Sequence, residues 1–180
     1  MEVSDSEFIS IIRVKKEADF IHLKEMFLEY AISIEFDLSF QNFIQELASL
    51  SGLYSNSAGA GFLLNIHGIS VGCIGIRKIT PDVAVIKWFY VRPGVGSPKI
   101  KKILLESAIE WAKELGIKNI CLNPEDSMAS AVKVFKEAGF IEGIGKQQTG
   151  TVKTKFLGLS LNRDPVLSGA EFIKIRICGM

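Results

Sequence analysis

Residues 83–116 constrain the fold most tightly, because they predict a strand, a short turn and a capped helix in direct succession. The stretch VAVIKWFYV (83–91) is rich in β-branched and aromatic residues, as is typical of a central strand. A helix is expected over 98–115, with Ser97 as its N-cap, Pro98 at its first position and Gly116 after its end. An apolar stripe at helical spacing supports this helix, formed by Ile100, Ile103, Leu104, Trp111 and Leu115.

Strands and helices are predicted along most of the remaining chain. The expected strands are 9–14, 62–66, 69–79, 117–122 and 152–161. The two middle strands form a hairpin around His67-Gly68. Residues 51–60 predict a polar loop. Helices are expected at 17–31, at 39–50 with Ser39 as N-cap, and from Asp126 or Ser127 to Gly139, which Phe140 follows as a hydrophobic contact.

The resulting order, β-α-α-β-β-β-α-β-α-β, predicts an α/β protein with a mixed sheet and helices on both faces. The 180 residues, 48% of them hydrophobic, suffice for one core. We therefore predict a single domain over 1–161, followed by a C-terminal tail over 162–180 with one extra strand at EFIKIRI. The net charge of +1 gives no field that favours nucleic acid or a membrane surface, so neither is expected as a partner.

Three features bear on compartment and on metal binding. The three cysteines are odd in number and far apart, so neither a disulfide framework nor a zinc site is expected, and a reducing, cytoplasmic compartment fits. The N-terminal MEVSDSEF carries acids where a secretory signal has basic residues. Residues 52–76 have no formal charge and are long enough to cross a bilayer, but Gly, Ser, Asn and His interrupt them, which favours the hairpin.

The helix expected at 98–115 carries Lys99, Lys101 and Lys102 in its first turn, where acids are usually preferred. The unpaired N–H groups and the dipole of a helix start attract anions, and each exposed cation there costs about 0.3–1 kcal/mol. A bound phosphate group would compensate for this cost. A solvated basic surface screened by salt is the alternative, and both interpretations stay open.

Four ordered sequence pieces carry a resemblance to a known family: GCIGIR (72–77), KWFYVRP (87–93), LLESAIEWAKELG (104–116) and SMASAVKVFKEAGF (127–140). Together they resemble the GNAT N-acetyltransferase superfamily, in particular its small bacterial members. The resemblance covers about residues 10–161, and the stretch 29–47 is similar to the family's early helices. It implies the GNAT fold and transfer of an acetyl group from acetyl-CoA to a small-molecule or peptide amine, which attacks the thioester directly.

The resemblance also implies where acetyl-CoA binds. In the family the strand corresponding to 83–91 lends backbone groups to pantetheine, the following turn and helix start wrap the pyrophosphate, and a backbone N–H stabilises the oxyanion. Tyr30, Glu35 and Asp37 are expected to line the amine site. The expected cofactor-binding residues are Phe89, Tyr90, Val91, Gly96, Ser97, Pro98, Lys99, Ile100, Lys101, Lys102 and Ser127.

The cofactor loop departs from the family signature, which is Arg or Gln, two residues, Gly, one residue, then Gly or Ala. These positions fall on Gly96, Lys99 and Lys101. Three outcomes stay open. The lysines bind phosphate as point cations, or they fill the groove so that CoA no longer fits, or Gly94 and Gly96 rebuild the turn.

Two further departures concern proton transfer. Phe135 stands where the family often has a Tyr that protonates the leaving thiolate, and Val85 stands where close relatives often have a Glu base. The catalytic residues are therefore unassigned. The function hypothesis is an acetyl-CoA-dependent N-acetyltransferase, whose rate these departures are expected to reduce. The alternative is a non-catalytic module on a GNAT fold that binds acyl-CoA, another phosphate ligand or a protein. A homodimer is left open.

Overall fold

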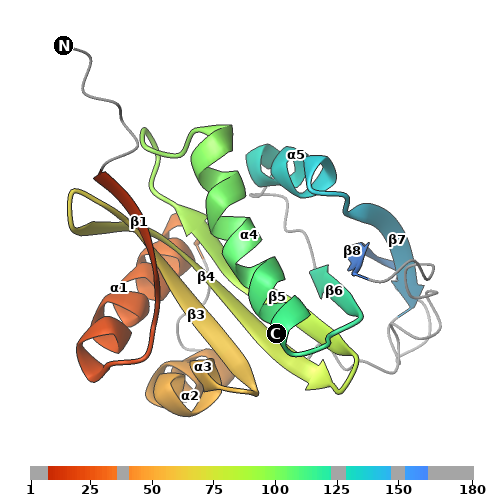
Figure 1. The fold of residues 1–180 in the computed structure, drawn as a ribbon, viewed down its shortest axis with the longest axis horizontal. Coiled ribbons are helices and arrows are strands. Elements are labelled where there is room, and N and C mark those ends of the chain that lie inside the picture. The colour runs from red at the N-terminus through yellow and green to blue at the C-terminus, as the bar shows by residue number, and fades with distance from the viewer. Residues whose placement is uncertain (1–7, 36–40, 123–128, 147–152, 162–180) are drawn as a thin grey trace.

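The computed structural model describes residues 8–35, 41–122, 129–146 and 153–161 (Figure 1). The mixed α/β class predicted from the sequence is confirmed. The helices are α1 (Glu17–Ser33), α2 (Gln41–Ala48), α3 (Leu50–Tyr54), α4 (Pro98–Glu114) and α5 (Ala129–Glu137). The strands are β1 (Ile9–Arg13), β2 (Ser55–Asn56), β3 (Gly59–Ile66), β4 (Ile69–Thr80), β5 (Val83–Val91), β6 (Asn119–Leu122), β7 (Ile141–Lys146) and β8 (Lys153–Ser160).

One mixed sheet contains all the described strands, in the order β1-β3-β4-β5-β6-β8-β7, with β2 paired to β3 off this path. The neighbours from β1 to β5 run antiparallel, and so do β6, β8 and β7. The two halves meet in a parallel pairing of β5 with β6, which joins Val83–Val85 to Asn119–Cys121. Three residue pairs thus connect an N-terminal meander to a C-terminal three-stranded unit.

The hairpin predicted around His67-Gly68 is confirmed. Ile66 pairs with Ile69, and the two residues between them have φ values of 51° and 79°. Two successive positive φ angles define a type I′ turn, whose twist matches that of the flanking strands. Glycine takes the second position at no steric cost.

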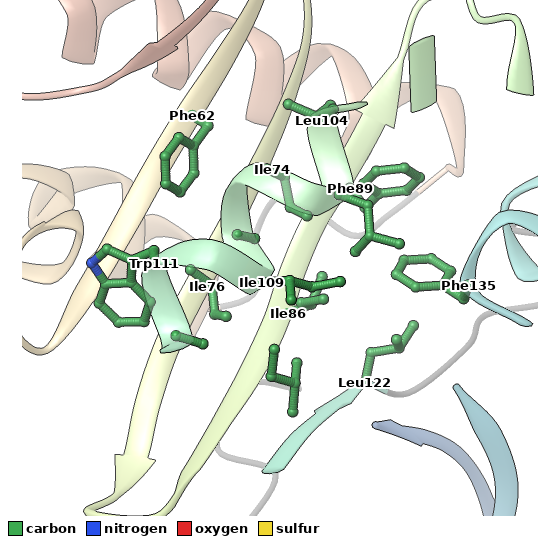
Figure 2. Packing of buried hydrophobic residues seen from close by; sticks show 14 of the residues in the cluster. Phe62, Ile74, Ile76, Ile86, Phe89, Leu104, Ile109, Trp111, Leu122 and Phe135 are labelled. Atoms are coloured by element: carbon green, nitrogen blue, oxygen red, sulfur yellow. The ribbon is translucent and has the colours of Figure 1, made fainter. Parts of the chain in front are cut away.

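Helices cover both faces of the sheet, as the element order predicted (Figure 1). Alternation along β4 assigns the faces: Ile74 and Ile76 pack with the apolar side of α4, whereas Cys73 packs with Phe27 of α1. Figure 2 shows the first of these clusters, in which α4 lies over the central strands. The two clusters lie on opposite sides of the sheet, so the chain has a core on each face.

The caps predicted for α4 and α5 are present where the structure describes them. The Ser97 hydroxyl accepts a hydrogen bond from Ile100 N at 3.3 Å, and Pro98 is the first helical residue. Gly116 and Gly139 have φ values of 68° and 98°, which suit glycine after a helix end. Ser39, Asp126 and Ser127, the other predicted capping residues, lie outside the described residues.

The predicted loop at 51–60 is wrong for most of its length. Residues 50–54 form α3, β2 follows at once, and β3 begins at Gly59. Leu50 and Tyr54 are four residues apart and both buried, so one helical turn places them in the core. Serine and glycine around them conceal this pair in the sequence.

Strand β7 was not predicted, because Gly143 and Gly145 lower its β propensity. The structure gives a reason for the first glycine. A Cβ on Gly143 would lie 2.3 Å from Cζ of Phe156 on the neighbouring strand β8, so a side chain there would displace the ring. Gly143 thus weakens the sequence signal for a strand, but its lack of a side chain makes room for the Phe156 ring.

Candidate active site

The sheet opens between β5 and β6. Their pairing stops at Val85 and Cys121, while β5 continues for six more residues, to Val91. Along this extension β4 pairs with the other edge of β5, as far as the pair Gly72–Val91. Within the described residues no strand pairs with the edge that faces β6. The backbone N–H and C=O groups on this edge of β5 are therefore placed to hydrogen-bond a ligand that extends alongside the strand.

A β-bulge distorts β5 at this opening. Cys73 pairs with Tyr90 and Gly75 pairs with Lys87, so two residues of β5 stand opposite one residue of β4. Trp88 has a φ of 58°, a conformation that is rare for bulky residues and costs about 1–3 kcal/mol. The extra residue lets Lys87 and Trp88 both face α1 and α2, as their contacts with Glu46 show. A bulge of this kind is common beside functional sites.

Side chains around Trp88 hold it in this strained conformation. Its indole N–H donates to Glu46 at 2.9 Å, and its carbonyl accepts a hydrogen bond from the Cys73 thiol at 3.2 Å. Both backbone and side chain of Trp88 are therefore fixed. Aromatic rings pack around the indole with centroid distances of 5.1 to 6.2 Å: Phe27, Tyr30 and Phe43.

Glu46 is a buried carboxylate, 8% exposed, with three donors around it. It accepts hydrogen bonds from Lys87 Nζ at 2.7 Å, from the Trp88 indole and from the Tyr54 hydroxyl. Burial is the largest single effect and raises the pKa of Glu46, but the charge of Lys87 and the hydrogen bonds from Lys87, Tyr54 and Trp88 together leave the pKa below its usual value. Glu46 is thus an anion that ties α2 and α3 to the bulge.

A second carboxylate ties α1 to the end of β5. Glu29 accepts two hydrogen bonds of 2.8 Å from Arg92, one from Nε and one from Nη2, and a third of 2.9 Å from the Tyr90 hydroxyl. The hydrogen bond from Arg92 lowers the pKa of Glu29. Burial, followed by the hydrogen bond to Glu29, raises the pKa of Tyr90 to about 12, so its phenol is protonated at neutral pH.

Neither cysteine nor metal chemistry is apparent at this site. Cys73 is fully buried, and burial raises the pKa of its thiol, so it is protonated and donates to Trp88. Among the residues that the structure describes, no three His, Cys, Asp or Glu side chains are grouped to hold a metal ion. The helices in the described part of the chain are all too short or too polar to cross a membrane.

The turn between β5 and α4 is built around Pro93 and Gly94. Val95 N donates to Arg92 O at 3.3 Å across these two residues, and Gly94 has a φ of 87°. This is the pattern of a type II turn, with proline and glycine at the two central positions. Gly94 thus shapes the turn between β5 and α4.

The helix start already satisfies part of its own hydrogen-bonding capacity. Pro98 has no N–H, and Ile100 N is bonded to the Ser97 hydroxyl. Lys99 and Lys102 are exposed, and Lys102 approaches Glu106 at 3.7 Å. Lys101 is half-buried and lies across the turn, because a Cβ on Gly96 would stand 2.9 Å from its Cε.

The structure brings together some of the residues expected at the site. Tyr90 and Val91 lie at the opening of the sheet, and Tyr30 packs between the rings of Trp88 and Tyr90. Glu35 is exposed beyond the end of α1 and shows no contact with the bulge. Asp37 and Ser127 lie outside the described residues, and so their predicted roles stay predictions.

Phe135 and Phe89 belong to the core beneath the site. Phe135 is 0% exposed, with its ring 5.0 Å from that of Phe89 and 5.3 Å from that of Phe140 (Figure 2). The side chain at this position is thus enclosed by aromatic rings and has no proton to donate. Packing accounts for Phe135 in full.

Sequence reasoning missed Glu29, Glu46 and the bulge at Trp88. A signal for Glu46 exists, because it is three residues from Phe43 and four from Leu50 and so falls within an apolar helical stripe. A carboxylate in such a stripe indicates a buried partner. No pattern marks the positive φ of Trp88, since a tryptophan flanked by β-formers predicts an ordinary strand.

The chain is similar in sequence and in structure to known acetyltransferases. The acetyltransferase (GNAT) family model matches residues 21–140. An uncharacterized N-acetyltransferase of Schizosaccharomyces pombe is 31% identical over 134 residues, covering 73% of this chain and 82% of the relative. A GNAT-family acetyltransferase of Staphylococcus aureus superimposes with a TM-score of 0.70 at 25% identity, over 86% of this chain and 99% of that one.

A more distant structural neighbour was solved with a ligand. A putative acetyltransferase of Salmonella typhimurium in complex with its cofactor acetyl-CoA superimposes with a TM-score of 0.62 at 15% identity, over 87% of this chain and 95% of that one. At this identity the likeness concerns the fold. The family match extends over two thirds of the chain and the S. pombe relative is 31% identical, and on these grounds the chain belongs to the GNAT acetyltransferase family.

Proposed function

We propose that this protein transfers the acetyl group of acetyl-CoA to a primary amine by direct attack. The observation that carries the proposal is the opening between β5 and β6, where an unpaired strand edge lies beside a strained bulge. Family membership supports it, as does the acetyl-CoA bound to the Salmonella neighbour of the same fold. The established family chemistry relies on positioning and on backbone donors, and therefore needs few special side chains.

The residues at the opening fit the pantetheine arm of acetyl-CoA, whereas the start of α4 differs from the usual site for the pyrophosphate. The edge of β5 at Phe89–Val91 fits an extended pantetheine arm, because it presents backbone donors and acceptors along its length. At the helix start Pro98 has no N–H, and the N–H of Ile100 already donates to the Ser97 hydroxyl. Fewer backbone donors are thus left for the pyrophosphate than in a glycine loop.

We assign the phosphates to the lysine side chains, which compensate for these missing donors by charge. Lys99, Lys101 and Lys102 place three cations within the first turn of α4. Ammonium groups on flexible stems bind phosphate as point charges and need no fixed geometry. Acetyl-CoA supplies the reactive thioester, and this chain supplies charge at one end and an oriented strand edge at the other.

A non-catalytic role is the second candidate, and the packing of Phe135 favours it. The position holds a buried ring in place of a proton donor, and Val85 offers no base. Such a protein would bind acyl-CoA and report its presence without turnover. Release of thiol separates the two candidates, because only the enzyme produces it.

Two measurements test the proposal on the full chain. Isothermal titration with acetyl-CoA at low and moderate salt is expected to show micromolar, salt-sensitive binding. Thiol release with a panel of primary amines is expected to exceed the rate without amine. Binding without thiol release would favour the second candidate. No binding at millimolar acetyl-CoA would overturn both.

A further inference from the structure

Arg77 occupies the same face of the sheet as the bulge. It lies on β4 directly opposite Val85 of β5, and residues paired in this way in an antiparallel sheet share a face. Val85 packs beside buried Val83 and Cys121. Alternation along β4 gives the same result, because Cys73, four residues before Arg77, packs with α1. Arg77 therefore faces the side that carries Trp88.

Arg77 differs from Lys87 and Arg92, which lie on the same side of the sheet, because no counter-ion for it is found among the described residues. Lys87 pairs with Glu46 at 2.7 Å, and Arg92 pairs with Glu29 at 2.8 Å. Arg77 is half-buried, yet it makes no ion pair or hydrogen bond with any part of the chain that the structure describes. None of its guanidinium nitrogens is fully buried, so the group reaches solvent at this face of the sheet. Its five donors are thus available to a ligand.

The residue opposite Arg77 is one reason why no partner for it is seen in the described part of the chain. A carboxylate at residue 85 would form a cross-strand pair with Arg77, since directly opposed side chains lie within about 5 Å at Cβ. Val85 cannot do so. Tyr54, next to Gly75 and fully buried, lies near enough for the Arg77 charge to act on its hydroxyl, but that group donates to Glu46. Among the described residues no acidic side chain pairs with Arg77, which leaves room for the carboxylate of a ligand.

We propose that Arg77 binds a carboxylate of the acceptor, so that the substrates of this protein are amino acids or other amines that carry a carboxylate. This inference rests on the proposed acetyl transfer. Arginine binds carboxylates through two parallel hydrogen bonds, which orients the acceptor as well as holding it. Val85 precedes Trp88 by three residues, or about 10 Å along a strand. The long Arg77 side chain can cover part of this distance, so an acceptor that spans the remainder reaches Arg77 with its carboxylate and the bulge with its amine.

Paired acceptors test this selectivity. Glycine, 4-aminobutyrate and 6-aminohexanoate are compared with their amides, which keep the amine and lose the negative charge. Thiol release from acetyl-CoA gives kcat/KM for each compound. For at least one pair, the wild-type protein is expected to prefer the acid by tenfold or more. Equal rates for every acid and its amide would overturn the inference.

Two variants show whether Arg77 causes the preference. Arg77→Met is expected to abolish the preference for the acid and to leave the rates with amides within twofold, while Arg77→Lys retains part of it. Val85→Glu places a carboxylate opposite Arg77 and is expected to lower the acid-to-amide ratio in the same direction. An Arg77→Met variant that loses activity equally with acids and amides would contradict a binding role.

A binding measurement distinguishes failure of this inference from failure of the proposed function. If no amine accelerates thiol release, acetyl transfer fails, but Arg77 is still tested by thermal unfolding with the same compounds. A rise in Tm with an acid, absent with its amide and absent in Arg77→Met, would support the carboxylate site. No rise with any acid, in a protein that also fails to release thiol, would overturn it.

Discussion

The indole of Trp88 donates a hydrogen bond of 2.9 Å to the carboxylate of Glu46, and this contact links helix α2 to the strained residue of β5. A φ of 58° at a tryptophan persists only where the surroundings compensate for it. Glu46 does so from one side, and the Cys73 thiol does so from the other. The bulge is thus held by side chains that lie far from it in the sequence.

Replacing Glu46 is expected to destabilise the protein strongly. Glu46→Leu leaves the Lys87 ammonium, the Trp88 indole and the Tyr54 hydroxyl without their acceptor, and breaking a buried pair in this way costs about 3–5 kcal/mol. Glu46→Gln keeps an acceptor oxygen and should cost less. Urea unfolding measures both free energies. Losses below about 1 kcal/mol in both variants would show that the contacts of Glu46 contribute little to stability.

Acidification is expected to remove the stabilisation that Glu29 provides. The hydrogen bond from Arg92 lowers the pKa of Glu29 from its usual 4.5, so the folded state favours the ionised form. The contribution is therefore complete above about pH 4.5 and is lost as pH falls through the lower folded value. Arg92→Met should be less stable than the wild type at neutral pH, with a difference that narrows below pH 4.5.

An exposed cation on α4 provides the control for this experiment. Lys113 pairs with Glu110 at 2.8 Å on the surface, and Lys113→Met removes the same charge without touching Glu29. Chemical denaturation between pH 3 and pH 7 gives the stability of each variant. A constant difference between wild type and Arg92→Met across this range would contradict the role of Glu29.

Removing the lysines of α4 is expected to weaken acetyl-CoA binding. In Lys99→Ala/Lys101→Ala, Kd should rise about tenfold, which corresponds to about 1.4 kcal/mol, and its dependence on salt should flatten. Lys133→Ala on α5, exposed and near Glu137, is the matched control. Isothermal titration measures all three proteins. Unchanged affinity in the double variant would reject phosphate binding by these side chains.

Glycine at the same two positions tests the opposite hypothesis. Lys101 lies across Gly96, so a blocked groove should open in Lys99→Gly/Lys101→Gly. Our proposal predicts weaker binding in this variant as well, because the charge is lost. Tighter binding would show that the lysines obstruct CoA.

Restoring a hydroxyl at residue 135 is not expected to restore a proton donor. Phe135→Tyr places a polar group among buried aromatic rings, at a cost of about 1–3 kcal/mol unless it finds a partner. We expect a lower Tm and no gain in the rate of thiol release. Phe140→Tyr, at 2% exposure and in contact with Phe135, serves as the control. A tenfold rate increase specific to residue 135 would show that the position reaches the reacting thiol.

Local signals in the sequence were sufficient to predict most of the fold. Ser97, Pro98 and Gly116 mark α4 because capping depends on residues next to one another in the chain. His67-Gly68 marks the hairpin for the same reason. The opening of the sheet was not predicted, since the register of β5 against β6 depends on packing between distant segments.

The polar contacts of the site could not be predicted because they join elements that are remote in the sequence. Glu46 and Trp88 are 42 residues apart, and Glu29 and Arg92 are 63 apart. Each residue alone predicts only an exposed acid on a helix or a member of a strand. That Arg77 has no partner among the described residues likewise becomes apparent only once the register places Val85 opposite it.

The short parallel pairing between β5 and β6 also has a consequence for how the chain assembles. Strands β3, β4 and β5 are joined by hairpin contacts close in sequence, whereas β6 must close a loop that contains all of α4. Contacts of this kind form late, because loop closure precedes their gain. The ligand-binding opening thus lies on the seam between an early and a late folding unit. Amide hydrogens of Val83–Val85 should consequently exchange faster than those of the β3–β4 hairpin, and acetyl-CoA should slow them.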